Sequence, residues 1–158
     1  MWQKIKPYVI SILISASVGA LSALLTMGSM DIYSELKAPP LAPPSFLFPI
    51  VWSILYVLMG VSAAIIYGYR EEKPKEVKSA LTTYGASLIV NFFWSIIFFN
   101  LRMLLASFAW IILLLYLVLK TIVQYQRINK AAAYLQIPYA LWVAFASYLN
   151  LGIWFLNR

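Results

Sequence analysis

Residues 46–69, FLFPIVWSILYVLMGVSAAIIYGY, decide the fold, because this long apolar stretch contains no charged residue. A helix needs roughly 20 mostly apolar residues to cross a lipid bilayer. Four further stretches are almost as free of charge, and one of them carries Lys120 near its end, where a lysine can reach the headgroups. The sequence therefore predicts an all-α membrane protein, a bundle of five transmembrane helices in one domain over 1–158. The expected helices run over about 5–27, 46–69, 79–100, 103–125 and 131–155.

Composition supports a membrane protein and excludes several classes of site. The chain is 63% hydrophobic and 11% charged, whereas a soluble domain is about half apolar and about one quarter charged. The net charge of +7 does not indicate nucleic-acid binding, because the basic residues fall in short loops between the spans. The absence of cysteine and histidine excludes disulfides, thiol catalysis, the usual zinc sites and histidine-ligated haem. We therefore expect neither a metal nor a cofactor.

The distribution of Lys and Arg predicts the orientation. The N-terminal segment, the loops after the second and fourth helices and Lys120 near the end of the fourth helix account for nine of these residues, and the opposite side carries only Lys37, Arg102 and Arg158. Loops rich in Lys and Arg stay in the cytoplasm. We therefore predict a multi-pass protein of the cell membrane with a cytoplasmic N-terminus, and with the loop 28–45 and the C-terminus outside.

No carboxylate, lysine or arginine lies in the middle of a predicted span. Ion-coupled transporters almost always place such a group inside the membrane, and the usual general acids and bases are missing as well. A ligand bound within the membrane would therefore meet aromatic surface and a few neutral polar groups.

Three of the helices carry such groups on one face each. At ~1.5 Å of rise per residue, most of them lie roughly 8–20 Å below the outer surface, so they can meet in one pocket. Tryptophans in an interfacial belt and asparagines that bond neighbouring backbone are the alternative, and periodicity alone leaves both open. The candidate pocket residues are Trp52, Tyr56, Asn91, Trp94, Tyr139, Trp142, Ala146 and Asn150.

The loop 28–45 ends in a proline-rich segment, LKAPPLAPPSFLFP over 36–49. Proline fixes φ and disfavours helix in the residue before it, so we expect a stiff, partly extended structure. Such a loop over the mouth of a pocket predicts a lid, with a proline-rich docking peptide as the weaker alternative. In the first helix Ser11, Ser15, Gly19 and Ala23 recur every four residues, which favours close packing inside the chain over a dimer interface.

Three motifs resemble those of the TspO family of translocator proteins and tryptophan-rich sensory proteins. The first joins the loop to the second helix, as Tyr33-x-x-Leu36-x-x-Pro39-x-x-x-Pro43-Pro44 and then Pro49-x-Val51-Trp52-x-x-Leu55-Tyr56-x-x-Met59-Gly60. The second is Asn91-x-x-Trp94 followed by Ile97-x-Phe99, and the third is Pro138-Tyr139-x-x-Trp142-x-x-Phe145-Ala146 with Leu149-Asn150. Together they span nearly the whole chain.

The resemblance implies a five-helix bundle, usually a homodimer, with a pocket under the first loop. It implies that the pocket accepts porphyrins and synthetic isoquinoline and benzodiazepine ligands. By matching position, Pro43 and Pro44 would shape the lid, and Trp52 and Trp142 are the candidates for light-dependent porphyrin breakdown. Leu151 stands where the sterol motif of animal members has tyrosine, so sterol binding through that motif is doubtful. The other implied pocket residues are Asn91, Trp94, Ala146 and Asn150.

The leading hypothesis is a membrane protein that binds a tetrapyrrole, protoporphyrin, as a ligand and promotes its degradation under light. The sequence does not decide whether such degradation is enzymatic. Two alternatives remain. One is a passive transporter of porphyrin or lipid among the membrane lipids. The other is a ligand-responsive sensor that acts on a partner through the charged loop 70–78.

Overall fold

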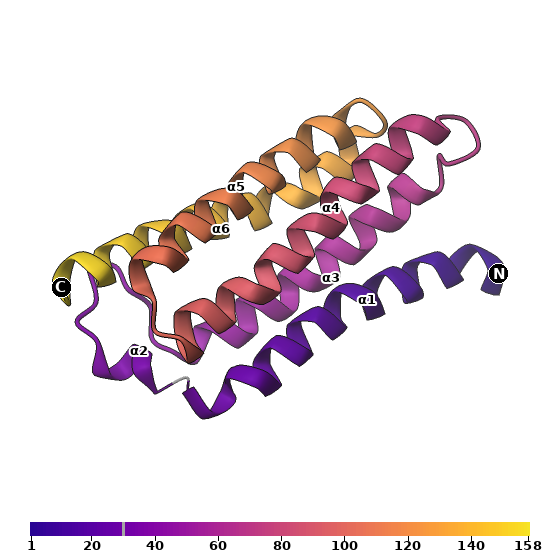
Figure 1. Ribbon diagram of the computed structural model, residues 1–158. Helices are drawn as coiled ribbons and strands as arrows, with labels where there is room; N and C mark the ends of the chain where they lie inside the picture. Colours follow the sequence, from indigo (N-terminus) through magenta and orange to yellow (C-terminus); the bar gives the residue numbers. More distant parts are fainter. Residues whose placement is uncertain (30) are drawn as a thin grey trace.

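The computed structural model describes residues 1–29 and 31–158, and its long elements are all helices (Figure 1). Each of the five long helices is sufficiently long and apolar to cross a membrane, which confirms the predicted all-α membrane bundle. Shorter elements are η1 (Met27–Ser29), α2 (Ile32–Glu35) and the π-turn η2 (Ile96–Asn100). The long helices are α1 (Trp2–Thr26), α3 (Leu47–Tyr67), α4 (Pro74–Ser95), α5 (Leu104–Gln126) and α6 (Lys130–Leu156).

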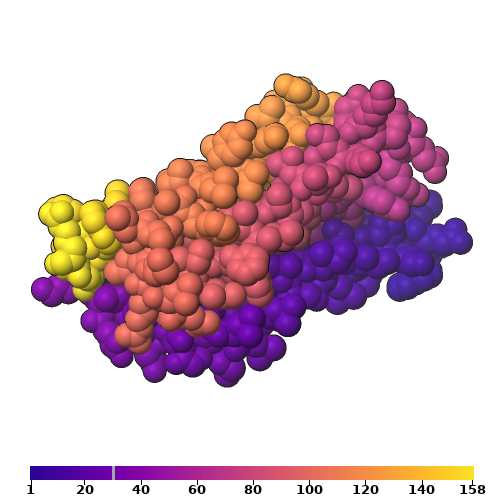
Figure 2. Space-filling view, viewed as in Figure 1, coloured from indigo at the N-terminus to yellow at the C-terminus, as the bar shows by residue number. Residues whose placement is uncertain are grey.

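The bundle has two different ends. The C-terminus and α2 lie at one end, which we call the lid end, and the N-terminus lies at the other, which we call the basic end (Figure 1). Helix α5 contacts α4 and α6, and α3 contacts α1 and α6. The space-filling view shows α1 along one side of the bundle, with the C-terminal residues beside the lid (Figure 2). Of the five spans, α1 is the least buried inside the molecule.

The third span begins earlier than predicted, at Pro74 rather than at residue 79. Proline suits the first turn of a helix, because an N–H group at that position would have no hydrogen-bond acceptor within the helix. The charged residues of 75–78 therefore lie on the first turns of α4, and the connection shortens to 68–73. At its other end the span leaves α-helical geometry, because the Leu101 amide donates to the carbonyl of Ile96 at 3.0 Å, five residues back.

The remaining bounds differ from the predicted ones by at most three residues. Helix α6 begins at Lys130, where the Asn129 side chain accepts a hydrogen bond from the Ala132 amide at 3.0 Å. An asparagine at this position satisfies a backbone donor that the helix itself leaves free.

The predicted lid is less extended than expected, because it contains the short helical segments η1 and α2. Met30, within the same predicted range, lies outside the described residues. At Leu36 the backbone is extended, and the Ala42 amide donates to the carbonyl of Pro39 at 3.3 Å. Leu41 has a φ of 70°, and a proline followed by a residue of positive φ is typical of a type II turn. Proline thus shapes this half of the lid.

Helix α1 uses its small residues to approach α3 closely. The Ser15 hydroxyl donates to the carbonyl of Tyr56 at 2.6 Å, and a methyl group on Gly60 would lie 2.6 Å from the Cα of Ile12. Gly19 lies against the ring of Tyr56. The small-residue stripe therefore packs α1 on α3 within one chain.

Candidate functional site

A cavity of about 450 Å³ lies in the lid-end half of the bundle, within the range of roughly 300–1,000 Å³ typical of ligand pockets. Helices α1, α3, α4 and α6 form its walls, together with the π-turn and Tyr33 of the lid. Helix α5 does not line it. Among the described residues, none of those lining the cavity is charged, and no group of three His, Cys, Asp or Glu is placed to hold a metal ion.

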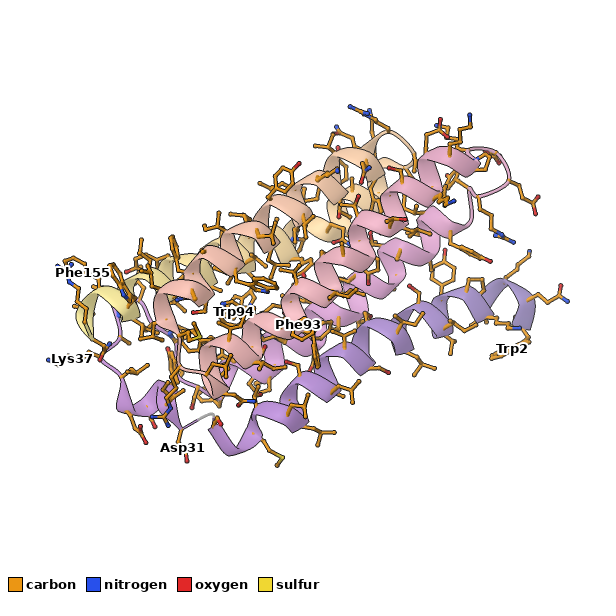
Figure 3. The ribbon with its side chains drawn as sticks, in the orientation of Figure 1. Trp2, Asp31, Lys37, Phe93, Trp94 and Phe155 are labelled. Carbon is orange, nitrogen blue, oxygen red and sulfur yellow. The ribbon has the colours of Figure 1, made fainter. Side chains whose placement is uncertain are left out.

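Aromatic side chains dominate the walls. Trp52 stacks on Tyr56 with ring centroids 5.6 Å apart, and Trp142 meets the edge of Phe48 at 5.8 Å. On the α4 side Trp94 stacks on Phe98 at 5.4 Å. In Figure 3 Trp94 lies within the bundle, whereas Trp2 lies at the basic end. The cavity therefore offers flat apolar surfaces on three sides.

The polar groups at the cavity are already engaged with each other. The Asn91 amide donates to the hydroxyls of Tyr56 and Tyr139, both at 3.3 Å. The Trp94 indole N–H donates to Asn150 Oδ1 at 3.0 Å, and the amide of Asn150 donates to a backbone carbonyl of α5 at 2.8 Å. Buried polar groups that are paired in this way hold the helices together. They leave the cavity with little capacity to bind a strongly polar ligand.

Trp142 is different, because its indole N–H is buried without a hydrogen-bond partner among the described residues. A buried donor without a partner costs free energy.

Tyr33 connects the lid to the cavity. Its hydroxyl donates to the carbonyl of Pro43 at 2.8 Å, and its ring meets the edge of Phe48 with centroids 5.0 Å apart. Partial burial raises the pKa of Tyr33 above its ordinary value of 10, so the hydroxyl stays protonated at neutral pH and continues to donate. Among the described residues of the lid, Tyr33 is thus the one that lines the cavity.

The second half of the lid is clasped by α6. Asn157 accepts a hydrogen bond from the Lys37 amide at 3.0 Å and donates to the Lys37 carbonyl at 2.8 Å. The Tyr148 hydroxyl donates to the carbonyl of Pro40 at 2.7 Å. Gly152 lets the lid approach, since a methyl group there would lie 2.6 Å from the Pro39 ring. The lid is therefore held over the end of the bundle by side chains of the last helix.

Most of the predicted pocket residues meet in this cavity, and three do not line it. Tyr139 is fully buried behind the wall and contacts it through its hydrogen bond from Asn91 and its edge-on packing with Trp52. The carbonyl of Pro43 accepts the bond from Tyr33, and neither Pro43 nor Pro44 lines the cavity. The predicted residues on the lining are Trp52, Tyr56, Asn91, Trp94, Trp142, Ala146 and Asn150.

One whole wall of the cavity was missed by sequence reasoning, because it consists of small residues of α1. Such residues carry no chemical signal, and the stripe containing Gly19 and Ala23 indicated only close packing. Tyr33 could have been found, since it begins the first of the three motifs. The α1 residues on the lining are Ala16, Gly19, Ala20, Ser22, Ala23 and Thr26.

The cavity also reaches the outside of the bundle along the seam between α1 and α3. Ala20 and Ala23 of α1 line the cavity and are exposed. Across the seam, Pro49, Ser53 and Val57 of α3 are likewise both cavity-lining and exposed. In a membrane this surface faces lipid, so an apolar molecule dissolved in the bilayer has a short route to the cavity.

Comparison with known proteins agrees with these features. The family model described as the TspO/MBR family matches residues 11–155. Tryptophan-rich protein TspO of Chlorobaculum tepidum is 38% identical over 125 residues, covering 79% of this chain and 78% of that protein. Protein CrtK of Rhodobacter capsulatus is 35% identical, covering 90% and 87%. Translocator protein of Ovis aries is 30% identical, covering 80% and 75%.

The matched region contains all five spans except the first residues of α1 and the last residue of α6. It includes the lid and every residue that lines the cavity. The chain therefore belongs to the TspO/MBR family of multi-pass membrane proteins.

Proposed function

We propose that the protein binds a flat tetrapyrrole, protoporphyrin, with its aromatic macrocycle in the cavity under the lid. The observation that carries the proposal is the wall of indole and phenol rings, Trp52, Tyr56, Trp94 and Trp142, around an uncharged space of about 450 Å³. Large aromatic ligands stack on such rings and gain affinity from the apolar area that they bury.

The residue types in the chain favour a porphyrin without bound iron over a haem. The chain has neither histidine nor cysteine to serve as an axial ligand. The isoquinoline and benzodiazepine ligands expected from the family are flat and aromatic as well, and the same walls would accept them.

Binding is tested by titrating the purified protein with protoporphyrin in the dark while following tryptophan fluorescence. The proposal expects saturable quenching, because several tryptophans line the cavity. An isoquinoline ligand should compete with the porphyrin and restore the fluorescence. Quenching that rises linearly and does not saturate would show partition into detergent instead, and would contradict the proposal.

We further propose that light promotes oxidation of the bound porphyrin by dissolved dioxygen, and that Trp52 and Trp142 each can give one electron to the excited macrocycle in this process. A bound, excited porphyrin would lie against these two oxidisable indoles, which line the cavity from α3 and α6. The variants Trp52→Phe and Trp142→Phe keep an aromatic ring but remove the indole. They should slow light-driven loss of the porphyrin absorption band while dark binding persists. Trp2→Phe, at an exposed position outside the cavity, is the matched control, and equal rates in all three variants would contradict this role.

A second candidate function is passive transfer of porphyrin or lipid, and the exposed seam between α1 and α3 favours it. A cavity that reaches the lipid can exchange its ligand with the bilayer and not only through the lid. Vesicles loaded with porphyrin, with and without the protein, test this function. Faster release with the protein supports transfer. Unchanged release would mean that the protein binds porphyrin without transferring it.

The same proposal includes the setting of the protein. We propose that it lies in the cell membrane as a homodimer with the basic end in the cytoplasm, since nine of the twelve Lys and Arg fall on that side. Labelling of single cysteines introduced at each end, in intact cells, tests the orientation.

A further inference from the structure

A second hollow, shallow and open to the surface, lies at the lid end and shares no residue with the aromatic cavity. It is formed by the start of α5 and the end of α6, on the side of the bundle away from α1. We call it the α5–α6 groove. Its lining residues are Arg102, Met103, Leu104, Leu105, Ala106, Ala109, Trp154, Asn157 and Arg158.

The groove combines an apolar floor with a cationic rim. The floor follows α5 from Met103 to Ala109, about one and a half turns into the membrane span. The rim carries the guanidinium groups of Arg102 and Arg158, and no carboxylate side chain is among the lining residues that the structure describes. Trp154, near the end of α6, also lines the groove, and tryptophans are frequent at the boundary of lipid and headgroups.

Both arginines remain available to an anion. Arg102 makes an ion pair with Glu35 at 3.8 Å, but both side chains are more than half exposed, and such surface pairs are weak. The guanidinium of Arg158 lies 4.4 Å from the ring centroid of Phe155. Stacking on an aromatic face leaves the N–H groups at the edge of the guanidinium free to donate.

The backbone at Arg102 has a φ of 53°, in the left-handed region that glycine adopts more readily. This conformation carries a conformational cost for a residue with a side chain. A long cationic side chain is therefore held at the rim at a position where glycine would suit the turn better.

We propose that the α5–α6 groove binds an anionic phospholipid of the phosphatidylglycerol class. Its phosphate would lie between Arg102 and Arg158, and one acyl chain would follow the floor past Leu105 and Ala109. The occupant is a lipid because the groove continues from a headgroup-level rim into a transmembrane span. It is an anionic lipid because the rim carries two guanidinium groups, which donate strong, charge-assisted hydrogen bonds to phosphate oxygens.

The test measures which lipid the protein retains. The protein is delipidated in detergent and equilibrated with equal amounts of phosphatidylglycerol and phosphatidylcholine, and bound lipid is counted by native mass spectrometry. Wild type should retain phosphatidylglycerol preferentially. Arg102→Gln and Arg158→Gln should each lower its retention about fivefold, which corresponds to about 1 kcal/mol for one basic residue at the surface. Lys37→Gln removes a positive charge at the same end but outside the groove, and should retain the lipid as wild type does.

Arg102→Gly separates a loss of lipid binding from a loss of folding. Glycine adopts a positive φ without strain, so this variant loses the guanidinium group without destabilising the turn. We expect this variant to be at least as resistant to heat as wild type and to lose the preference for phosphatidylglycerol. Equal losses in Lys37→Gln and the arginine variants would show unspecific attraction and overturn the proposal. No preference for phosphatidylglycerol in wild type would overturn it as well.

Discussion

Replacing Gly19 by alanine should push the aromatic floor of the cavity out of place. The added methyl carbon would lie 2.7 Å from Tyr56 Cδ2 and closer still to Cε2. Carbon atoms in favourable contact are about 3.5–4.0 Å apart, so the ring has to retreat by about 1 Å. Tyr56 stacks on Trp52 and accepts a hydrogen bond from Asn91. The displacement is therefore passed on to two other cavity residues.

The expected magnitude follows from comparison with a second glycine. Overpacking a well-packed site costs about 1–3 kcal/mol, while alanine gains up to about 1 kcal/mol over glycine in a helix. Gly85 lies inside α4 and has nothing within 4 Å of an added methyl group. Because the helix gain is common to both substitutions, Gly19→Ala should be less stable than Gly85→Ala by about 1–3 kcal/mol.

The assay is unfolding of both variants in the same detergent, by denaturant titration followed by circular dichroism, together with a protoporphyrin titration in the dark. Gly19→Ala should also bind porphyrin more weakly, whereas Gly85→Ala should bind as wild type does. Equal stability and equal affinity in the two variants would refute the close packing of α1 on Tyr56.

Two further predictions concern hydrogen bonds around the cavity. Trp94→Phe removes the hydrogen-bond donor to the buried Asn150 and should lower the free energy of unfolding by about 1–3 kcal/mol. Denaturant titration measures this difference. A free energy of unfolding equal to that of wild type would mean that water replaces the indole as the donor. Asn157→Ala removes both bonds to Lys37 of the lid, so backbone amides of 36–43 should exchange hydrogen faster while those of α4 do not. Unchanged exchange at 36–43 would mean that this clasp does not hold the lid.

The sequence predicted the spans well because a charge-free run of sufficient length has few alternatives in a membrane. It also predicted that Trp52, Asn91, Trp94 and Asn150 would meet. Helices that cross the bundle side by side convert residue number into depth, so residues at equal depth can be matched from the sequence alone.

The lid and the α1 wall were harder to predict for physical reasons. Prolines indicated a stiff loop, but they do not specify which atoms a loop turns inward, and Tyr33 faces the cavity while Pro43 supplies only a carbonyl. Small residues such as Ala20 are equally compatible with packing against a helix, with packing against a second chain and with lining a cavity. The space beside the small residues of α1 results from the way α1 packs on α3, which the sequence of α1 alone does not specify. The π-turn that ends the third span has no local sequence signal either.

Filling the cavity under the lid is the simplest way to decide whether porphyrin binds there. Ala146 lines the cavity and is buried on α6, whereas Leu141 of the same helix is 67% exposed on the outer surface of the bundle. Dark protoporphyrin titrations of wild type, Ala146→Phe and Leu141→Phe should show saturable quenching in wild type and Leu141→Phe. Ala146→Phe should retain its helical circular dichroism and lose saturable quenching. Equal quenching in all three proteins would contradict the proposed site, because porphyrin would then bind outside the cavity.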